Sequence, residues 1–290
     1  MKSVSIIGAG RMGGALAIAL SRNGVPVRQL VYRGERQLSD IVEVSPSIET
    51  VPNVTDLGTG GIDILIITTG DAEITAVAED LAQLGVRGLT ILHTSGALSS
   101  SILSRLADLG NEVGSMHPLV SISDPVKGAS SFKDIGFCVE GTEIAVSDAL
   151  ALVEKLGGRP FEIPTELKPL YHASAVMSSG HFTALIDTAI DVLTKCGLTG
   201  DQALSVLGPL LSSTVDNIRS QGTTKALTGS FARFDVEVIR KHLSMLEEHA
   251  SPEALAVYKL LGERSTAIAE RTNGSTERSR AVREALSEHR

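Results

Sequence analysis

Near its N-terminus the chain reads Ser3-Val4-Ser5-Ile6-Ile7-Gly8-Ala9-Gly10-Arg11-Met12-Gly13, and this stretch decides the fold. An apolar run ends in a glycine-rich turn, and residues 15–20 continue as the buried face of a helix. In a strand, glycine turn and helix of this kind, Gly8 permits the sharp bend, Gly10 lets a pyrophosphate approach and Gly13 lets the helix pack closely. The N–H groups and the positive end of the helix dipole then face the phosphates. The stretch predicts dinucleotide binding; a glycine turn used only for packing is the alternative.

Strand and helix patterns alternate through the first half of the chain. Apolar runs typical of buried strands occupy residues 26–32, 62–68, 89–92, 112–116, 136–140 and 160–163. Helical patterns occupy residues 74–84, 99–109 and 144–156. This alternation predicts an α/β fold, a Rossmann-type doubly wound parallel sheet with right-handed crossovers.

Beyond Pro164 the pattern becomes helical throughout. Helices are predicted at residues 170–196, 201–218, 235–249 and 252–270. We therefore expect a dinucleotide-binding domain at residues 1–164, an all-α substrate and dimerisation domain at 165–272, and a polar tail at 273–290 that is frayed helix or disorder.

Composition excludes several classes of protein. Hydrophobic residues make up 42% and charged residues 21% of the 290 residues, which excludes disordered and fibrous classes. The net charge is −8, Lys and Arg are scattered and aromatic residues are few, so nucleic acid is not expected as a partner. Cys138 and Cys196 have no metal-ligand spacing and sit in apolar contexts, so we expect buried free thiols and neither a metal site nor a disulfide. No stretch suits a membrane span or a signal peptide, and we expect a cytoplasmic protein.

The residues that follow the second predicted strand, 26–32, indicate whether the cofactor is NAD or NADP. NAD binders usually place an acidic residue about 20 residues beyond the glycines, whereas an arginine there suits the 2′-phosphate of NADP. This chain offers Arg33, with Arg36 one turn later, so NADP is predicted; Glu35 reaching the ribose, as for NAD, is the alternative. Thr69, at the end of the strand 62–68, is assigned to the cofactor as well.

Polar residues follow two further strands. His93 and Ser95 end one strand and His117 ends the next. Ligands in open α/β folds collect at the carboxyl ends of the strands, so we expect these residues at the nicotinamide half of the site, with Ser95 shared between cofactor and substrate. The alternatives are local: Thr94 or Ser95 as a helix N-cap, and His117 fixing the turn before Pro118.

A second polar group opens the helical region. Lys168, His172 and Ser179 fall at positions i, i+4 and i+11 and share one helix face. Lys168 is predicted to supply the proton as hydride arrives, with His172 as its catalytic partner and Ser179 on the substrate. Tyr171 is an additional donor candidate, and a solvated surface charge is the alternative for Lys168.

Several motifs together resemble the 6-phosphogluconate-dehydrogenase-like superfamily of NAD(P) oxidoreductases. Within it, the chain is similar to a bacterial family that joins a Rossmann-like domain to a helical domain of unassigned function. The motifs are Gly8-Ala9-Gly10-Arg11-Met12-Gly13, His93-Thr94-Ser95-Gly96-Ala97, His117-Pro118-Leu119, Tyr171-His172-Ala173 and Leu227-Thr228-Gly229-Ser230-Phe231-Ala232-Arg233-Phe234-Asp235.

The resemblance implies a hydride-transfer enzyme. Lys168 with His172 resembles the lysine and asparagine pair of hydroxyacid dehydrogenases and ketopantoate reductase, with His172 in place of the asparagine. Residues 178–181 are similar in place to the serine-glycine-proline stretch of pyrroline-5-carboxylate reductase, with His181 in place of the proline.

The sequence as a whole predicts an NADP-dependent oxidoreductase acting on a carbonyl or imine carbon of a small, carboxylate-bearing substrate. Arg233 is its candidate carboxylate anchor, or else a structural ion pair with Asp235. The long helices, rich in Ala, Leu and Ile, predict a homodimer. The rivals are a protein that holds NADP without turning it over, favoured by the weak match at the catalytic positions, and a methyltransferase or other nucleotide binder.

Overall fold

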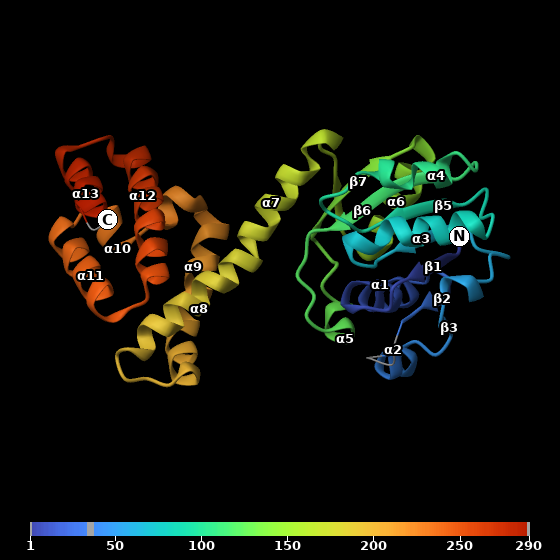
Figure 1. Ribbon diagram of the computed structural model, residues 1–290, viewed down its shortest axis with the longest axis horizontal. Coiled ribbons are helices and arrows are strands. Elements are labelled where there is room, and N and C mark those ends of the chain that lie inside the picture. The colour runs from blue at the N-terminus through green and yellow to red at the C-terminus, as the bar shows by residue number, and fades with distance from the viewer. Residues whose placement is uncertain (1, 34–37, 289–290) are drawn as a thin grey trace. The chain divides into compact units, whose positions relative to one another are not determined.

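The computed structural model describes residues 2–33 and 38–288 of the chain. They divide into two compact units, Met1–Ser179 and Gly180–Arg290, here called unit 1 and unit 2 (Figure 1). Gly34, Glu35, Arg36 and Gln37 lie outside the described residues, so the alternatives that involve Glu35 and Arg36 fall outside them too.

Unit 1 is built on one eight-stranded sheet, which confirms the predicted α/β class. Its strands stand in the order β3-β2-β1-β4-β5-β6-β7-β8. Their bounds are β1 Val4–Ile7, β2 Val27–Val31, β3 Glu49–Val51, β4 Ile64–Ile67, β5 Thr90–His93, β6 Glu112–Pro118, β7 Gly136–Gly141 and β8 Arg159–Phe161. Chain order reverses between β1 and β4, which is the switch point where open α/β sheets bind their ligands.

One strand pair departs from the predicted parallel sheet. β7 runs antiparallel to β6, with Met116 opposite Val139 and His117 opposite Cys138, whereas β7 and β8 are parallel. A parallel return requires a crossover, usually a helix. The connection from β6 to β7 holds only the four-residue helix α5, Pro125–Gly128, which packs against α1 instead of crossing the sheet.

Helices cover both faces of the sheet. Those of unit 1 are α1 Arg11–Arg22, α2 Leu38–Val44, α3 Asp71–Gln83, α4 Ser104–Ala107, α5, α6 Glu143–Leu156 and α7 Lys168–Ser178, with short 3-10 turns at η1 Val54–Asp56, η2 Ser100–Leu103 and η3 Thr165–Leu167. The predicted helix 99–109 is therefore η2 followed by α4. β3, α2 and α5 have no counterpart in the sequence prediction, because each is too short to show a period.

Alternate residues of the central strands enter two separate cores. Ile64 and Ile66 of β4 pack with α1 and α6, while Leu65 and Ile67 pack with α3 and α4. Side chains of a strand point alternately to its two faces, so a strand covered on both sides is apolar throughout. This is why β1 and β4 stood out in the sequence.

The predicted helix 170–196 is two helices. α7 ends at Ser178, and α8, Gly180–Thr194, follows after Ser179, whose φ of −127° and ψ of −75° are not helical. Ser and Gly are weak helix formers, which explains a break at Ser178-Ser179-Gly180. The compact units also divide here, 15 residues later than the predicted boundary at residue 164, because α7 belongs to unit 1, where Lys168 is fully buried.

Unit 2 is helical. Besides α8 it contains α9 Gly200–Ala226, α10 Gly229–Ala232, α11 Val236–His249, α12 Pro252–Asn273 and α13 Glu277–Glu288. A capping box between Thr199 and Gln202 starts α9. No helix among the described residues is both long enough and apolar enough to cross a membrane.

The tail that the sequence left as frayed helix or disorder is a packed helix. α13 buries Val282, Ala285 and Leu286 against α11 and α12. Arg283 also forms ion pairs with Glu263 and Glu270 of α12. The apolar positions of α13 are few and spaced by charged residues, so its amphipathic face was easily read as a polar tail.

Candidate functional site

The glycine turn between β1 and α1 has no room for side chains at two of its three glycines. A Cβ on Gly13 would lie 1.9 Å from the carbonyl oxygen of Gly8, and Gly8 itself has a φ of +112°. Gly10, in contrast, has no atom within 4 Å of an added Cβ. Close helix packing therefore requires Gly13, the bend requires Gly8, and Gly10 leaves open space beside the N-terminus of α1.

The end of β4 closes this turn from the neighbouring strand. The hydroxyl of Thr68 donates to the carbonyl oxygen of Gly8 at 2.7 Å. The next hydroxyl, that of Thr69, is buried and has no partner among the described residues. A buried hydroxyl usually has a hydrogen-bond partner, so Thr69 is an unused polar group at the place where a phosphate would lie. Together with the open space at Gly10, it fits a dinucleotide.

Arg33 lies two residues beyond β2 and is exposed. Its guanidinium is 3.6 Å from the carboxylate of Glu73 in the first turn of α3, and both side chains are more than half exposed. Such a surface pair is worth little and competes weakly with a phosphate for the arginine. Arg33 is thus free to turn toward a ligand at the carboxyl end of β2.

His93 ends β5 and is fully buried. Its Nδ1 accepts a hydrogen bond from the backbone N–H of Ser95, whereas its Nε2 has no partner among the described residues. Burial, with the nearby charge of Lys168 adding to it, lowers the pKa of His93 to about 4. The Ser95 hydroxyl accepts from the N–H groups of Ala97 and Leu98 in the turn after β5, whereas the next helix, η2, has Ser99 as its N-cap, so the expected N-cap at Thr94 or Ser95 is wrong. His93 is therefore a neutral group that fixes the backbone after β5.

Four residues form one cluster, here called the His-Tyr cluster. They are Gly96 after β5, His117 near the end of β6, and Tyr171 and His172 on α7. Nδ1 of His117 is 2.6 Å from the hydroxyl of Tyr171, and the two rings meet edge to face. The rings of His117 and His172 also meet edge to face, with centroids 5.8 Å apart. The structure thus brings together the strand-end histidine and the helix residues that the sequence had treated as separate groups.

Gly96 makes the packing of the His-Tyr cluster possible. A Cβ on Gly96 would lie 2.6 Å from Nδ1 of His172 and 2.8 Å from Nε2 of His117. The Nδ1 of His172 is buried without a partner among the described residues. Burial, with the charges of His172 and Lys168 adding to it, lowers the pKa of His117 to about 4. Burial also raises the pKa of Tyr171. Around pH 7 the His117 and Tyr171 side chains are therefore neutral hydrogen-bonding groups.

Lys168 is fully buried, which rules out the alternative of a solvated surface charge. Its ammonium donates to the hydroxyl of Ser115 on β6 and to Oε1 of Glu140 on β7, the latter at 3.2 Å. Burial alone would raise the pKa of Glu140, but hydrogen bonds from Ser100 and Ser115 and the charge of Lys168 outweigh it and hold that pKa below its usual value. A buried charge is tolerated when it is paired and hydrogen-bonded in this way.

The remaining predicted substrate residues lie outside this cluster. Ser179 follows the last residue of α7, two helical turns beyond His172, and its hydroxyl donates to the carbonyl oxygen of Ala175. Arg233 lies at the C-terminal end of α10 in unit 2 and is exposed. Among the described residues, no ion pair joins Arg233 to Asp235, which was the structural alternative for this arginine.

Sequence reasoning missed Ser115, Glu140 and Gly96. Glu140 stands in the strand Gly136–Gly141, between apolar neighbours. A carboxylate in such a strand needs a buried cation, and that signal could have marked Glu140, although it does not say which cation is the partner. The close approach of two rings to Gly96 has no sequence signal, because it depends on how α7 packs on β5 and β6.

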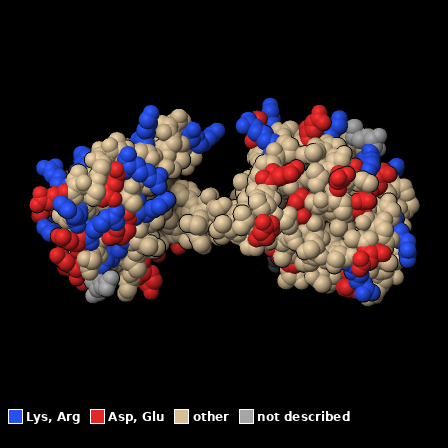
Figure 2. All heavy atoms as spheres, turned by 90° about the horizontal axis from the view of Figure 1, so that it is seen from above, with Lys and Arg blue, Asp and Glu red and all other residues tan. Residues whose placement is uncertain are grey.

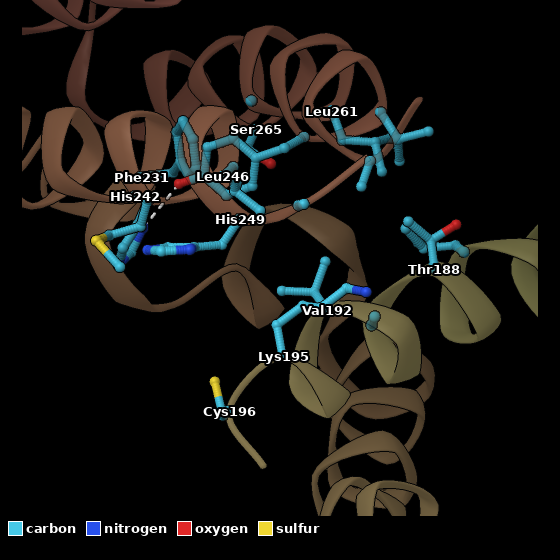
Figure 3. A pocket seen from close by; sticks show the side chains of 18 residues that line it. Thr188, Val192, Lys195, Cys196, Phe231, His242, Leu246, His249, Leu261 and Ser265 are labelled. Atoms are coloured by element: carbon cyan, nitrogen blue, oxygen red, sulfur yellow. Dashed lines mark hydrogen bonds between the residues drawn. The ribbon is translucent and has the colours of Figure 1, made fainter. Parts of the chain in front are cut away.

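Unit 2 contains a cavity of about 670 Å³ (Figure 3). Its lining comes from α8, α11 and α12 and is mostly apolar, with Val192, Leu246 and Leu261 as examples. One polar pair lies in its wall, where Nδ1 of His242 is 2.8 Å from the hydroxyl of Tyr258. This histidine and tyrosine repeat the contact of His117 with Tyr171 at a second place in the chain.

Two models of known protein families match separate parts of the chain. Residues 1–118 match the model of a Rossmann-like domain, and residues 135–265 match a domain of unknown function, DUF2520. No curated protein matches the sequence.

Solved structures share the fold over nearly the whole chain. A provisionally assigned NADP oxidoreductase from Bacteroides fragilis is 22% identical with a TM-score of 0.74, covering 92% of this chain and 98% of its own. A protein from Thermotoga maritima is 23% identical with a TM-score of 0.72, covering 93% and 99%. A reductive aminase from Aspergillus terreus, solved with NADPH and ethyl-5-oxohexanoate, is 16% identical with a TM-score of 0.65, covering 97% and 98%. The chain therefore joins a Rossmann-like domain to a DUF2520 domain, the two-domain arrangement that its motifs resemble.

Proposed function

We propose that the protein is an NADP-dependent oxidoreductase that transfers hydride between the nicotinamide and a carbonyl or imine carbon of a small substrate. One observation carries this proposal. The glycine turn, the unused Thr69 hydroxyl, Gly96 and His117 lie at the carboxyl ends of neighbouring strands of one sheet, β1, β4, β5 and β6. His117 in turn contacts Tyr171 and His172 of α7. That edge is where open α/β sheets bind ligands.

Residues at the turn are proposed to hold the cofactor. The backbone of Gly8, Ala9, Gly10, Arg11, Met12 and Gly13 and the hydroxyl of Thr69 would bind the pyrophosphate, and Arg33 would bind the 2′-phosphate. The fold relatives described as an NADP oxidoreductase and an NADPH complex support this choice. When bound, the cofactor supplies the hydride.

Substrate contacts are proposed for His172, His117 and Ser95. His172 points an unpartnered nitrogen toward Gly96, and imidazole nitrogens orient a carbonyl or imine by hydrogen bonds. Lys168 was predicted as the proton donor. Because its ammonium is buried in the ion pair with Glu140, we propose that it positions β6, β7 and α7 for the cluster instead of contacting the substrate.

The preference for a carboxylate-bearing substrate rests on Arg233 and stays a prediction, as does a substrate contact of Ser179. An exposed, planar guanidinium suits bidentate binding of a carboxylate. In an active preparation, Arg233→Met should raise KM for a keto acid and leave KM for the matching keto ester unchanged. Equal KM changes for both would remove this role.

We also propose that the protein forms a homodimer and is located in the cytoplasm. α8 has no buried residue, and α9 exposes Leu204, Val206 and Leu210. Residues 180–186 of α8 contain no Asp, Glu, Lys or Arg. Uncharged apolar surface of this extent marks an interface, and two-fold homodimers are the commonest assemblies. Elsewhere on the face seen in Figure 2, charges of both signs are interspersed, which does not favour a nucleic-acid partner.

Titration with NADPH, followed by a panel of carbonyl and imine compounds, tests the function. The panel includes ethyl levulinate, a cyclic imino acid, and cyclohexanone with allylamine. We expect NADPH to bind and at least one compound to oxidise it. Binding without oxidation by any compound would favour the rival of a non-catalytic NADP-binding protein, which the engagement of Lys168 in its ion pair would explain. Absence of NADPH binding would overturn both the proposed oxidoreductase and the non-catalytic NADP-binding protein.

A further inference from the structure

We infer that Tyr171 is the proton donor of the reaction and that His117 is the positioning residue that holds its hydroxyl. The inference rests on the proposed function and deepens it. It starts from the 2.6 Å contact between the Tyr171 hydroxyl and Nδ1 of His117. A reduction of a carbonyl needs one proton for each hydride, so some side chain at this site has to supply it or orient water to do so.

Three other titratable side chains near Tyr171, those of Lys168, His93 and His117, are engaged or lack a proton to give. Lys168 has its ammonium in the buried contacts with Ser115 and Glu140. His93 is fully buried behind the cluster, with its Nδ1 bound to the N–H of Ser95. Burial keeps His93 and His117 in their neutral forms, so neither carries an acidic imidazolium at pH 7.

Tyr171 meets the geometric requirements of a donor. Its side chain is partly exposed, and it lies on α7 one residue before His172. Its ring is fixed on two sides, by the edge-to-face contact with His117 and by a second one with Phe161 on β8, whose centroid is 5.8 Å away. A fixed ring that shows part of its surface holds the hydroxyl in one place without preventing access to it.

His117 determines which way the hydroxyl proton points. In the tautomer with a proton on Nδ1, the imidazole donates to the tyrosine oxygen, and the tyrosine proton is left free for the substrate. Gly96 lets the other side of the His117 ring, with Nε2, pack against the backbone after β5. Backbone packing on one side and tyrosine on the other thus hold the imidazole.

The proposed step balances. The carbonyl carbon accepts the hydride of the reduced nicotinamide, the C=O π bond breaks, and its oxygen takes the proton from the Tyr171 hydroxyl. The tyrosinate that remains accepts the hydrogen bond from Nδ1–H of His117, and water returns the proton after the product leaves. Burial raises the pKa of Tyr171, so the hydroxyl keeps its proton at pH 7 and gives it only to the strongly basic oxygen that forms as the hydride arrives.

The test compares two kinds of substrate in Tyr171→Phe. Neutral cyclohexanone requires a proton during reduction, whereas a quaternary N-methyl cyclic iminium ion carries its own positive charge and requires none. We expect Tyr171→Phe to lower turnover of the ketone by about 100-fold or more and to leave turnover of the iminium ion and the Kd of NADPH nearly unchanged. Phenylalanine keeps the ring that packs against Phe161 and removes only the hydroxyl.

Tyr258→Phe is the matched control. It removes the same hydroxyl from the His242–Tyr258 pair of unit 2, whose nitrogen and oxygen are 2.8 Å apart, and should change neither rate. Equal losses on ketone and iminium ion in Tyr171→Phe would show a structural role and overturn the inference. So would an unchanged ketone rate. If the wild type reduces no carbonyl or imine compound of the panel, the proposed function fails and the inference with it.

A second measurement needs neither substrate nor cofactor. Nitrogen-15 NMR of labelled histidines reports which ring nitrogen carries the proton. We expect the Nδ1–H form for His117 in the wild type and a shifted tautomer equilibrium in Tyr171→Phe, with His242 unchanged. An Nε2–H form of His117 in the wild type would mean that Tyr171 donates to the imidazole, and it would overturn the inference even in an active enzyme.

Discussion

The ammonium of Lys168 lies 3.2 Å from Oε1 of Glu140, with the lysine side chain fully buried and the glutamate side chain 9% exposed. The pair joins the first turn of α7 to β7, and Ser115 ties both to β6. It therefore fixes the helix that carries Tyr171 and His172 onto the strands that carry His117 and Glu140.

Breaking this pair should destabilise unit 1 strongly. Lys168→Met leaves a buried carboxylate without its cation, which costs about 3–5 kcal/mol. The double variant Lys168→Met with Glu140→Gln removes the unpaired charge and should recover part of that loss. Urea unfolding gives the free energy of unfolding of the wild type, of Lys168→Met and of the double variant. Arg105→Met, which breaks the exposed pair with Glu79 at 3.0 Å, is the control and should change the free energy of unfolding by less than about 1 kcal/mol. If Lys168→Met also lowers the free energy of unfolding by less than about 1 kcal/mol, the Lys168–Glu140 pair has no structural role.

Alanine at Gly96 should disturb the His-Tyr cluster. The added Cβ would lie within 2.8 Å of both His172 and His117, so the rings must shift, at a cost of about 1–3 kcal/mol. We expect loss of turnover together with shifted histidine NMR signals. Gly60→Ala is the control, since no atom lies within 4 Å of its added Cβ and its φ is not positive. Full activity of Gly96→Ala would mean that the two rings tolerate displacement.

Arg33 should determine the preference for NADPH over NADH. A charged hydrogen bond to the 2′-phosphate is worth about 1.5–3 kcal/mol, so Arg33→Ala should weaken NADPH binding about 10- to 100-fold. NADH binding should stay the same, because NADH lacks that phosphate. Fluorescence titration gives both constants. Arg22→Ala, in the last turn of α1, is the control at the far end of the same helix from the glycine turn. If the variant loses NADH and NADPH affinity equally, Arg33 does not select the cofactor.

His93 should make the protein less stable in mild acid. Its pKa is lowered from 6.5 to about 4 by burial, so the unfolded chain binds a proton that the folded chain does not. Stability rises with pH wherever the unfolded state binds more protons. The contribution is complete above pH 6.5 and is lost as the pH falls toward about 4. His93→Asn, which keeps an acceptor for the Ser95 N–H, should show a smaller loss of unfolding free energy over this range than the wild type. Parallel curves for the two proteins would contradict the assignment.

Leu210→Glu should dissociate the proposed homodimer. Leu210 of α9 is 61% exposed, and a carboxylate there would be buried without a partner in an interface. Light scattering after size exclusion should give twice the chain mass for the wild type and the single mass for the variant. Ile144→Glu, at a 51% exposed position of unit 1, is the control and should remain a dimer. A monomeric wild type would remove the proposal.

Local sequence determined the parts of this protein whose physics is local. The turn from Ile7 to Gly13 specifies a strand, a bend and a helix within one stretch, and buried strands such as β4 are apolar on both faces. These signals predicted the α/β class, the helical second half of the chain and the proposed cofactor-binding residues. Short elements such as β3 and α2 were missed, since a few residues show no period.

Tertiary structure alone decided what surrounds each polar side chain. Lys168 reads in sequence equally well as a surface charge or a proton donor, and its burial beside Glu140 depends on residues 28 positions apart meeting across β6, β7 and α7. The same holds for Tyr171 and His117, which are 54 positions apart and in contact. Helix periodicity gives the face on which a residue lies but not the partner that face meets, because packing between distant segments sets burial, hydrogen bonds and pKa.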